Sequence, residues 1–115
     1  MEGDLGSQLR EFTGTEHWYR HWTRAFAYTD GVKYLADKTG AYWLIDVIAS
    51  HQPKVRKIPF QVWNLTTQDA KGHVTMREDE DQPAIVKQEI EYTDFPLKHI
   101  DLYLSEKVLM LPGEY

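Results

Sequence analysis

The chain has 115 residues, contains no cysteine and carries a formal net charge of −5 at pH 7. This length fits one domain, and the absence of thiols excludes cysteine nucleophiles, disulfides and cysteine-bound zinc. We expect one cytoplasmic domain over residues 1–115, with residues 1–8 frayed. Neither a signal peptide nor a membrane span is expected, because the start is acidic and Asp46 interrupts the longest apolar stretch.

The first thirty residues predict short elements. Residues 5–12 fit a helix that ends near Gly14, since glycine readily takes the left-handed conformation that closes a helix. Residues 16–22 are rich in aromatic side chains and fit either a helical turn or an irregular loop. Residues 24–28 alternate between the two sides of an extended chain, which predicts a short strand.

Two helices are expected next. Thr29 or Asp30 fits an N-cap, since either side chain can accept from the free amides of the first turn, and Gly40 fits the end of that helix. A second helix is expected over residues 41–50, and it is apolar nearly all round. The pair Gln52-Pro53 should end it, because proline cannot continue the backbone hydrogen bonding.

The rest of the chain predicts strands, because the apolar pattern changes to period two near residue 58. Asp69-Ala70-Lys71-Gly72 fits a hairpin turn, and residues 93–96 fit a single helical turn after a cap. The expected strands cover residues 58–65, 73–78, 84–92, 100–104 and 108–111. Together these elements predict an α+β fold, with an antiparallel β-meander of about five or six strands and two main helices packed on one face.

Several strings of residues resemble a family of small bacterial proteins known only as a domain of unknown function. These strings are Phe12–Glu16, Tyr28–Ala36, Gly40–Asp46 and Leu109–Tyr115, so the resemblance extends over most of the chain from about Leu9. Members of that family often occur on phages, plasmids and other mobile elements. The resemblance therefore implies an accessory role, and it assigns no catalytic residue.

Two features could carry chemistry, and we interpret both as structural. His17 and His21 are four residues apart and would share one face of a helix, but no third ligand with suitable spacing accompanies them. Asp46 lies in the most apolar helix, one turn after Tyr42, where burial could raise its pKa, but no catalytic partner can be nominated. We therefore expect no catalytic residue, no metal and no cofactor.

Two surfaces could carry binding. Residues 1–60 have a net charge of +1, residues 77–115 have a net charge of −6, and the whole chain lacks a broad basic surface, which disfavours direct nucleic-acid binding. The acidic candidates, which could imitate a phosphate backbone, are Glu78, Asp79, Glu80, Asp81, Glu89 and Glu91. The alternative set, which combines cations with aromatic rings that could stack on bases, is Trp18, Arg20, Trp22, Arg24, Lys54, Arg56 and Lys57.

These observations predict a non-catalytic interaction protein of a phage or mobile element that binds a protein partner. An inhibitor of a host defence complex that handles nucleic acid, such as a CRISPR effector, fits the acidic C-terminal half. The alternative is a nucleic-acid-binding module that uses the basic and aromatic residues. The sequence leaves open the partner, the binding face and whether the chain forms a homodimer.

Overall fold

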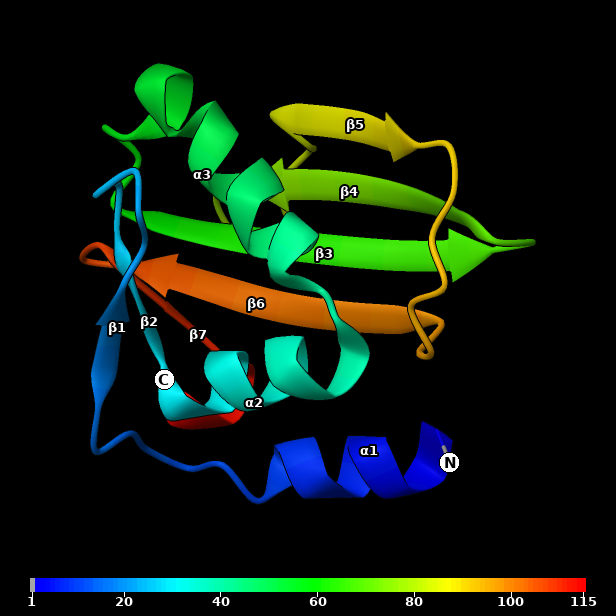
Figure 1. Cartoon of the computed structure of the whole chain (residues 1–115). Coiled ribbons are helices and arrows are strands. Elements are labelled where there is room, and N and C mark those ends of the chain that lie inside the picture. Colours follow the sequence, from blue (N-terminus) through cyan, green and yellow to red (C-terminus); the bar gives the residue numbers. More distant parts are fainter. Residues whose placement is uncertain (1) are drawn as a thin grey trace.

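Three helices, a short 3-10 helix and seven strands make up the protein, and Figure 1 shows their arrangement in a computed structural model that describes residues 2–115. The helices are α1 (Glu2–Arg10), α2 (Asp30–Thr39) and α3 (Tyr42–Val55), with η1 (Pro112–Glu114) near the C-terminus. The strands are β1 (Trp18–Arg20), β2 (Ala27–Thr29), β3 (Phe60–Gln68), β4 (Lys71–Arg77), β5 (Val86–Ile90), β6 (His99–Ser105) and β7 (Val108–Met110). No helix in this described range is long and apolar enough to cross a membrane.

All seven strands form one sheet in the order β1-β2-β7-β6-β3-β4-β5. The α+β class is confirmed, but the expected meander of five or six antiparallel strands is wrong. Strand β6 pairs with β3 and not with the preceding strand β5, and β7 pairs with β2 in parallel. The C-terminal hairpin therefore joins the N-terminal strands to the rest of the sheet.

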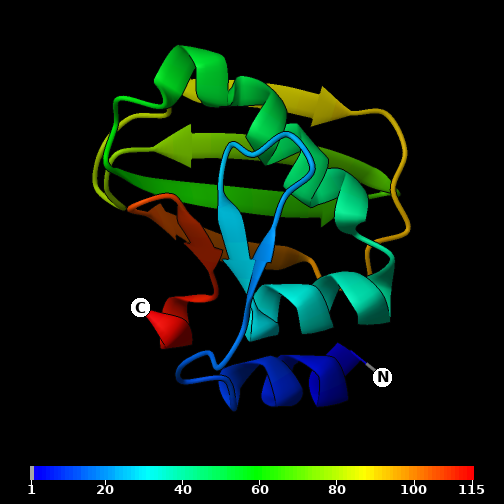
Figure 2. The same cartoon turned by 60° about the vertical axis from the view of Figure 1, so that its left-hand side comes forward.

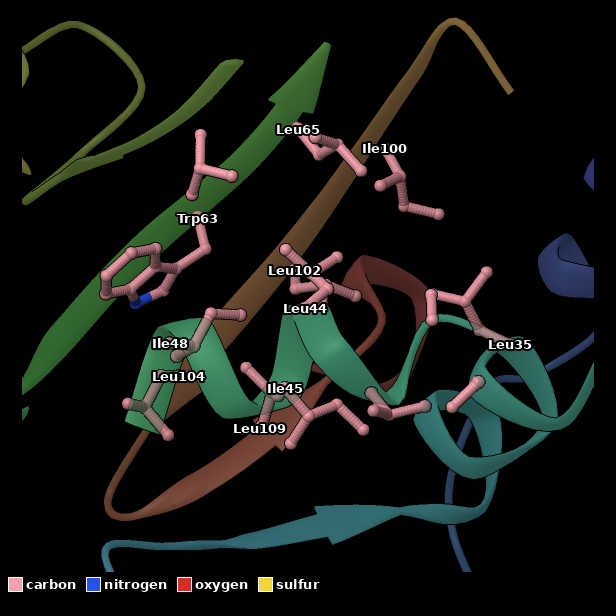
Figure 3. Close-up of a cluster of buried hydrophobic side chains, with 14 of the residues drawn as sticks. Leu35, Leu44, Ile45, Ile48, Trp63, Leu65, Ile100, Leu102, Leu104 and Leu109 are labelled. Atoms are coloured by element: carbon pink, nitrogen blue, oxygen red, sulfur yellow. The ribbon is translucent and has the colours of Figure 1, made fainter. Parts of the chain in front are cut away.

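The core lies between the sheet and α3, as Figure 3 shows. Leu44, Ile45 and Ile48 project from α3 toward inward-facing side chains of the strands. Alternate residues of β3 supply that layer, with Trp63 and Leu65 each only 1% exposed. Period-two alternation on the strands thus builds one apolar face that α3 covers.

Helix α2 has the ends that local signals predict. The Thr29 hydroxyl accepts from the amide of Val32, and Gly40 ends the helix with φ of 74°. A hairpin turn is also confirmed at Asp69 and Ala70, where both residues have positive φ and Gln68 pairs with Lys71.

Helix α3 differs from its predicted length, because it continues through Pro53 to Val55. Proline removes one backbone hydrogen bond, and a buried side-chain network holds the last turn in place. Gln52 and Gln61 exchange two amide hydrogen bonds of 3.0 and 3.1 Å, and Gln61 also donates to the carbonyls of Val55 and Ile58. This long-range contact with β3 explains why a local proline signal did not end the helix.

Four smaller predictions also change. Residues 18–20, inside the undecided aromatic segment, form β1, and the strand predicted from residue 24 begins only at Ala27 because Arg24 has a φ of 66° in the connecting turn. Residues 93–96 form no helical turn, since the Thr93 hydroxyl accepts from Phe95 in a local turn. Helix α1 begins at Glu2 and therefore includes most of the segment expected to be frayed.

Helices α2 and α3 lie on the same side of the sheet, and α1 packs beside α2, as Figures 1 and 2 show. The β1–β2 hairpin turns toward α3, which Figure 2 shows from the front. No helix within residues 2–115 lies over the opposite face of β3, β4, β5 and β6, as Figures 1 and 2 show. We call this surface the outer face. Two surfaces are therefore open to partners: the hairpin beside α3, and the outer face.

Candidate binding surfaces

Two exposed tryptophans lie on the β1–β2 hairpin. Trp18 in β1 is 59% exposed, and Trp22 in the turn is 79% exposed. Arg20 and Arg24 accompany them and are exposed as well. The structure thus brings together four of the seven predicted basic and aromatic residues, and we call these four the hairpin surface.

The tip of the hairpin is fastened to the middle of α3. His21 is only 4% exposed, and its Nε2 atom lies 2.7 Å from Oδ1 of Asp46. The Thr23 amide donates to Nδ1 of the same ring, so Nε2 is the nitrogen that donates to Asp46. Trp22 donates its indole N–H to the same carboxylate oxygen over 3.1 Å. A large exposed ring is therefore held in a defined orientation.

The base of the hairpin is fastened to the first turn of α2. The carboxylate of Asp30 accepts from the amides of Glu16 and His17 and from the Tyr19 hydroxyl, at distances of 2.9, 3.3 and 2.9 Å. These hydrogen bonds, led by the Glu16 amide, lower the pKa of Asp30 to about 2. The ionised carboxylate also suits the positive end of the α2 dipole.

This anchor predicts a pH dependence. A carboxyl group whose folded pKa is depressed contributes stability that is present above its ordinary pKa of 3.8 and is lost as the pH falls toward about 2. Acidification through this window should loosen the hairpin, and Asp30→Asn should remove that part of the stability at neutral pH. Urea unfolding followed by tryptophan fluorescence between pH 5 and pH 2 measures both effects. If the free energy of unfolding depends on pH in the same way for wild type and Asp30→Asn, this role of Asp30 is contradicted.

The remaining basic candidates lie toward the C-terminal end of α3. Asp46, Ser50 and Lys54 are exposed at intervals of four residues, so they form one stripe along the helix. Lys54 lies about 12 Å along the axis from Asp46, given a rise of about 1.5 Å per residue. Arg56 and Lys57 follow the helix and are exposed. The structure therefore places these three cations at the C-terminal end of α3, and it does not bring them into the hairpin surface.

The acidic candidates lie on the other side of the molecule. Glu78–Asp81 form the exposed loop between β4 and β5, and the Tyr103 hydroxyl donates to Glu80 over 2.8 Å. This hydrogen bond is the main reason that the pKa of Tyr103 is raised to about 12. On β5, Glu89 lies 2.7 Å from Nδ1 of His73, and Glu91 directly follows the strand and is exposed. The loop is acidic throughout, but the strands beside it also present cations: Lys71, Arg77 and Lys87.

The two histidines of the N-terminal segment contact different acidic side chains. His17 and His21 lie at the two ends of β1, not on a helix, and contact different carboxylates. No group of three His, Asp or Glu side chains in the described range could hold a metal ion. On the outer face, His99 lies 3.1 Å from Asp101 and its Nδ1 atom accepts from Asn64.

Two cavities adjoin this histidine. A groove of about 790 Å³ lies between α1, the start of β6 and η1, with Leu9, Leu97 and Ile100 among its apolar lining residues. A second cavity of about 450 Å³, which we call the outer pocket, is lined by Val62, Asn64, Thr66, Arg77, Glu80, His99 and Asp101. Among the polar members of this set, sequence reasoning selected only Glu80. The alternation of β3, β4 and β6 was the signal that could have placed them on one face.

Comparison with known proteins completes this description. No curated protein and no solved structure matches the chain. One family model matches residues 3–115, and its description is a family of unknown function, DUF6876. The match confirms the expected membership in a family without an assigned function. The chain belongs to the family of unknown function DUF6876.

Proposed function

We propose that the chain is a non-catalytic protein-binding module that contacts its partner through the hairpin surface. The observation that carries this proposal is Trp22, which is 79% exposed and yet hydrogen-bonded through its indole N–H to Asp46. Large apolar side chains are normally buried. An exposed ring that a hydrogen bond within the same chain holds in one orientation is typical of a contact surface.

The composition of the hairpin surface supports this proposal. Tryptophan and arginine are the residues that most often dominate the binding energy of protein interfaces, and this surface presents two of each. Anchors at Asp30 and Asp46 hold both ends of the hairpin before a partner arrives. A preformed loop loses less conformational entropy on binding, so more of the contact energy appears as affinity.

Charge favours a protein partner over a nucleic acid. The Asp46 carboxylate is 53% exposed and lies beside the indole edge of Trp22, where it would repel a phosphate backbone. The chain as a whole has a net charge of −5, which also opposes a polyanion. A protein surface with a few carboxylates for Arg20 and Arg24, and an apolar site for the rings, fits both features.

A second candidate function uses the acidic loop at residues 78–81. Four consecutive acidic side chains are exposed there, and Glu80 is held by Tyr103, so the loop is a defined acidic protrusion. Such a protrusion could occupy a nucleic-acid site on a host complex, which is the inhibitor role expected from the acidic C-terminal half. In that case the partner is basic and contacts the outer face.

Capture experiments test the proposal with a matched variant. We expect Trp22→Ala to weaken binding to the main captured protein by at least about thirtyfold, since interface hot spots contribute 2 kcal/mol or more. Tyr92→Ala is the control, because Tyr92 is 72% exposed and lies outside the hairpin surface. Tagged wild type and both variants are incubated with host lysate, and the affinity for each retained protein is then measured in purified form.

Three outcomes would contradict the proposal. In the first, Trp22→Ala retains the same proteins with unchanged affinity. In the second, no protein is retained by wild type and lost by the variant. In the third, the chain binds single-stranded DNA or RNA at low salt, and Trp22→Ala abolishes that binding. The partner would then be a nucleic acid and not a protein.

A further inference from the structure

Arg77 is the least explained polar side chain in the protein. It ends β4 on the outer face, opposite Val62 of β3. Its Nε atom is buried and has no hydrogen-bond partner, and no other buried side-chain nitrogen or oxygen in the described range lacks one. No carboxylate there lies within ion-pair distance of its guanidinium. Since a guanidinium stays charged, a buried donor without a partner destabilises the folded protein.

The polar side chains around Arg77 each have a hydrogen-bond partner other than Arg77. In the outer pocket, Glu80 accepts from the Tyr103 hydroxyl, and Asp101 accepts from the Asn64 amide over 2.8 Å. His99 uses both ring nitrogens in the same cluster. Arg77 is the one positively charged side chain that lines this pocket. Because its Nε atom is buried, a ligand in the pocket would contact the terminal N–H groups of the guanidinium, and their planar arrangement matches a carboxylate or phosphate.

The pocket also has a negative part. Glu80 and Asp101 line it together with Arg77, so its formal charge is about −1 with His99 neutral. A ligand that carries only negative charge would be attracted by Arg77 and repelled by both carboxylates. The carboxylates would repel a phosphate dianion about twice as strongly as a monoanion. A ligand with one carboxylate and one ammonium group complements both parts.

We propose that the outer pocket binds a small zwitterionic amino acid, with the ligand carboxylate on Arg77 and its ammonium group toward Glu80 and Asp101. The cavity of about 450 Å³ accommodates a molecule of this size, and Val62 supplies an apolar wall for a side chain. This site lies on the outer face and is independent of the hairpin surface. If the outer pocket binds no amino acid, the proposed function of the hairpin surface is therefore unaffected.

The buried Nε–H of Arg77 is the direct reporter. Its resonance in the ¹⁵N-labelled full chain is followed during titration with L-leucine, 4-methylpentanoate, 3-methylbutylamine and inorganic phosphate at constant ionic strength. The second probe lacks the amine of leucine, and the third lacks its carboxylate. We expect a saturable shift with L-leucine and at least about tenfold weaker binding of each single-charge probe, since charge-assisted hydrogen bonds contribute about 1.5–3 kcal/mol.

Three variants separate this site from general ion binding. Arg77→Lys should abolish the leucine-induced shift of the Asn64 side-chain amide, because lysine cannot reproduce the two-pronged contact. Arg24→Lys, on the hairpin surface, should leave it unchanged. Asp101→Asn should weaken L-leucine and strengthen 4-methylpentanoate, since it removes a negative charge from the pocket.

The proposal is overturned if L-leucine gives no saturable shift, or if phosphate binds more tightly than L-leucine. It is also overturned if Arg77→Lys binds L-leucine as wild type does. An Asp101→Asn variant that weakens leucine and 4-methylpentanoate equally would contradict the placement of the ammonium group.

Discussion

Gln61→Leu is expected to lower the free energy of unfolding by about 4 kcal/mol, because the indole N–H of Trp63 and the side-chain oxygen of Gln52 both lose their only partner in one step. Trp63 donates its indole N–H to Gln61 over 2.9 Å, and the Gln52 amide both donates to and accepts from Gln61. Leucine can replace none of these bonds. A loss of that size is a large part of the total stability of an ordinary domain.

Urea unfolding of three variants tests this expectation. Gln68→Leu is the matched control, since Gln68 lies on the same strand and is exposed, and it should change stability by less than about 0.5 kcal/mol. The double variant Gln52→Leu/Gln61→Leu should lose less than the sum of the two single losses, because both members of the amide pair become apolar. Additive losses, or a small effect of Gln61→Leu alone, would show that the network contributes little.

Gly31→Ala is expected to destabilise the protein by about 2 kcal/mol, although alanine normally stabilises a helix. A Cβ atom at Gly31 would lie 2.5 Å from a carboxylate oxygen of Glu114 and 2.7 Å from Leu111. Glu114 accepts there from the Thr29 hydroxyl and from the amides of Gly31 and Leu111. The new methyl group would displace this carboxylate from the first turn of α2 and detach the C-terminal segment.

Gly6→Ala provides the matched control for this glycine. Gly6 is also helical, and a Cβ atom there would make only an ordinary contact with Arg10, at 3.5 Å. We expect this substitution to raise stability by about 0.5–1 kcal/mol, as helix propensity predicts. Thermal unfolding of both variants should therefore give shifts of opposite sign. Equal stabilisation by the two alanines would contradict the close packing of Glu114 on α2.

The parts of the fold that sequence reasoning predicted depend on local chemistry. Thr29 and Gly40 delimit α2 through a side-chain cap and a left-handed residue, and neither requires a distant contact. Asp69 and Ala70 form a two-residue hairpin turn between strands that are adjacent in sequence. In these places the local preference and the final structure agree.

The predictions that failed depend on contacts between distant segments. Strand β2 pairs with β7 in parallel across about 80 residues of sequence, and no local pattern encodes that pairing. Pro53 would normally end a helix, but α3 continues past it because Gln52 hydrogen-bonds to Gln61 of β3. Strand β1 lacked a clear period because both of its outward residues are exposed on an edge strand.

The candidate sites also contain residues that local sequence features selected and residues whose role depends on distant contacts. Residue type alone selected the exposed tryptophans and arginines of the hairpin, because such side chains at a surface have few other uses. The hydrogen bond between His21 and Asp46, which spans 25 residues of sequence, was not predicted. Arg77 was not selected either, since its significance comes from the absence of a partner in three dimensions.

Hydrogen–deuterium exchange of the captured complex, compared with the free chain, tests the central claim most directly. If the hairpin surface is the contact, residues 18–24 and the part of α3 around Asp46 should become protected on binding, while Tyr92 and the acidic loop at residues 78–81 should exchange as before. Protection confined to residues 78–81 and the adjoining outer face, with the hairpin unchanged, would contradict the account and assign binding to the acidic loop.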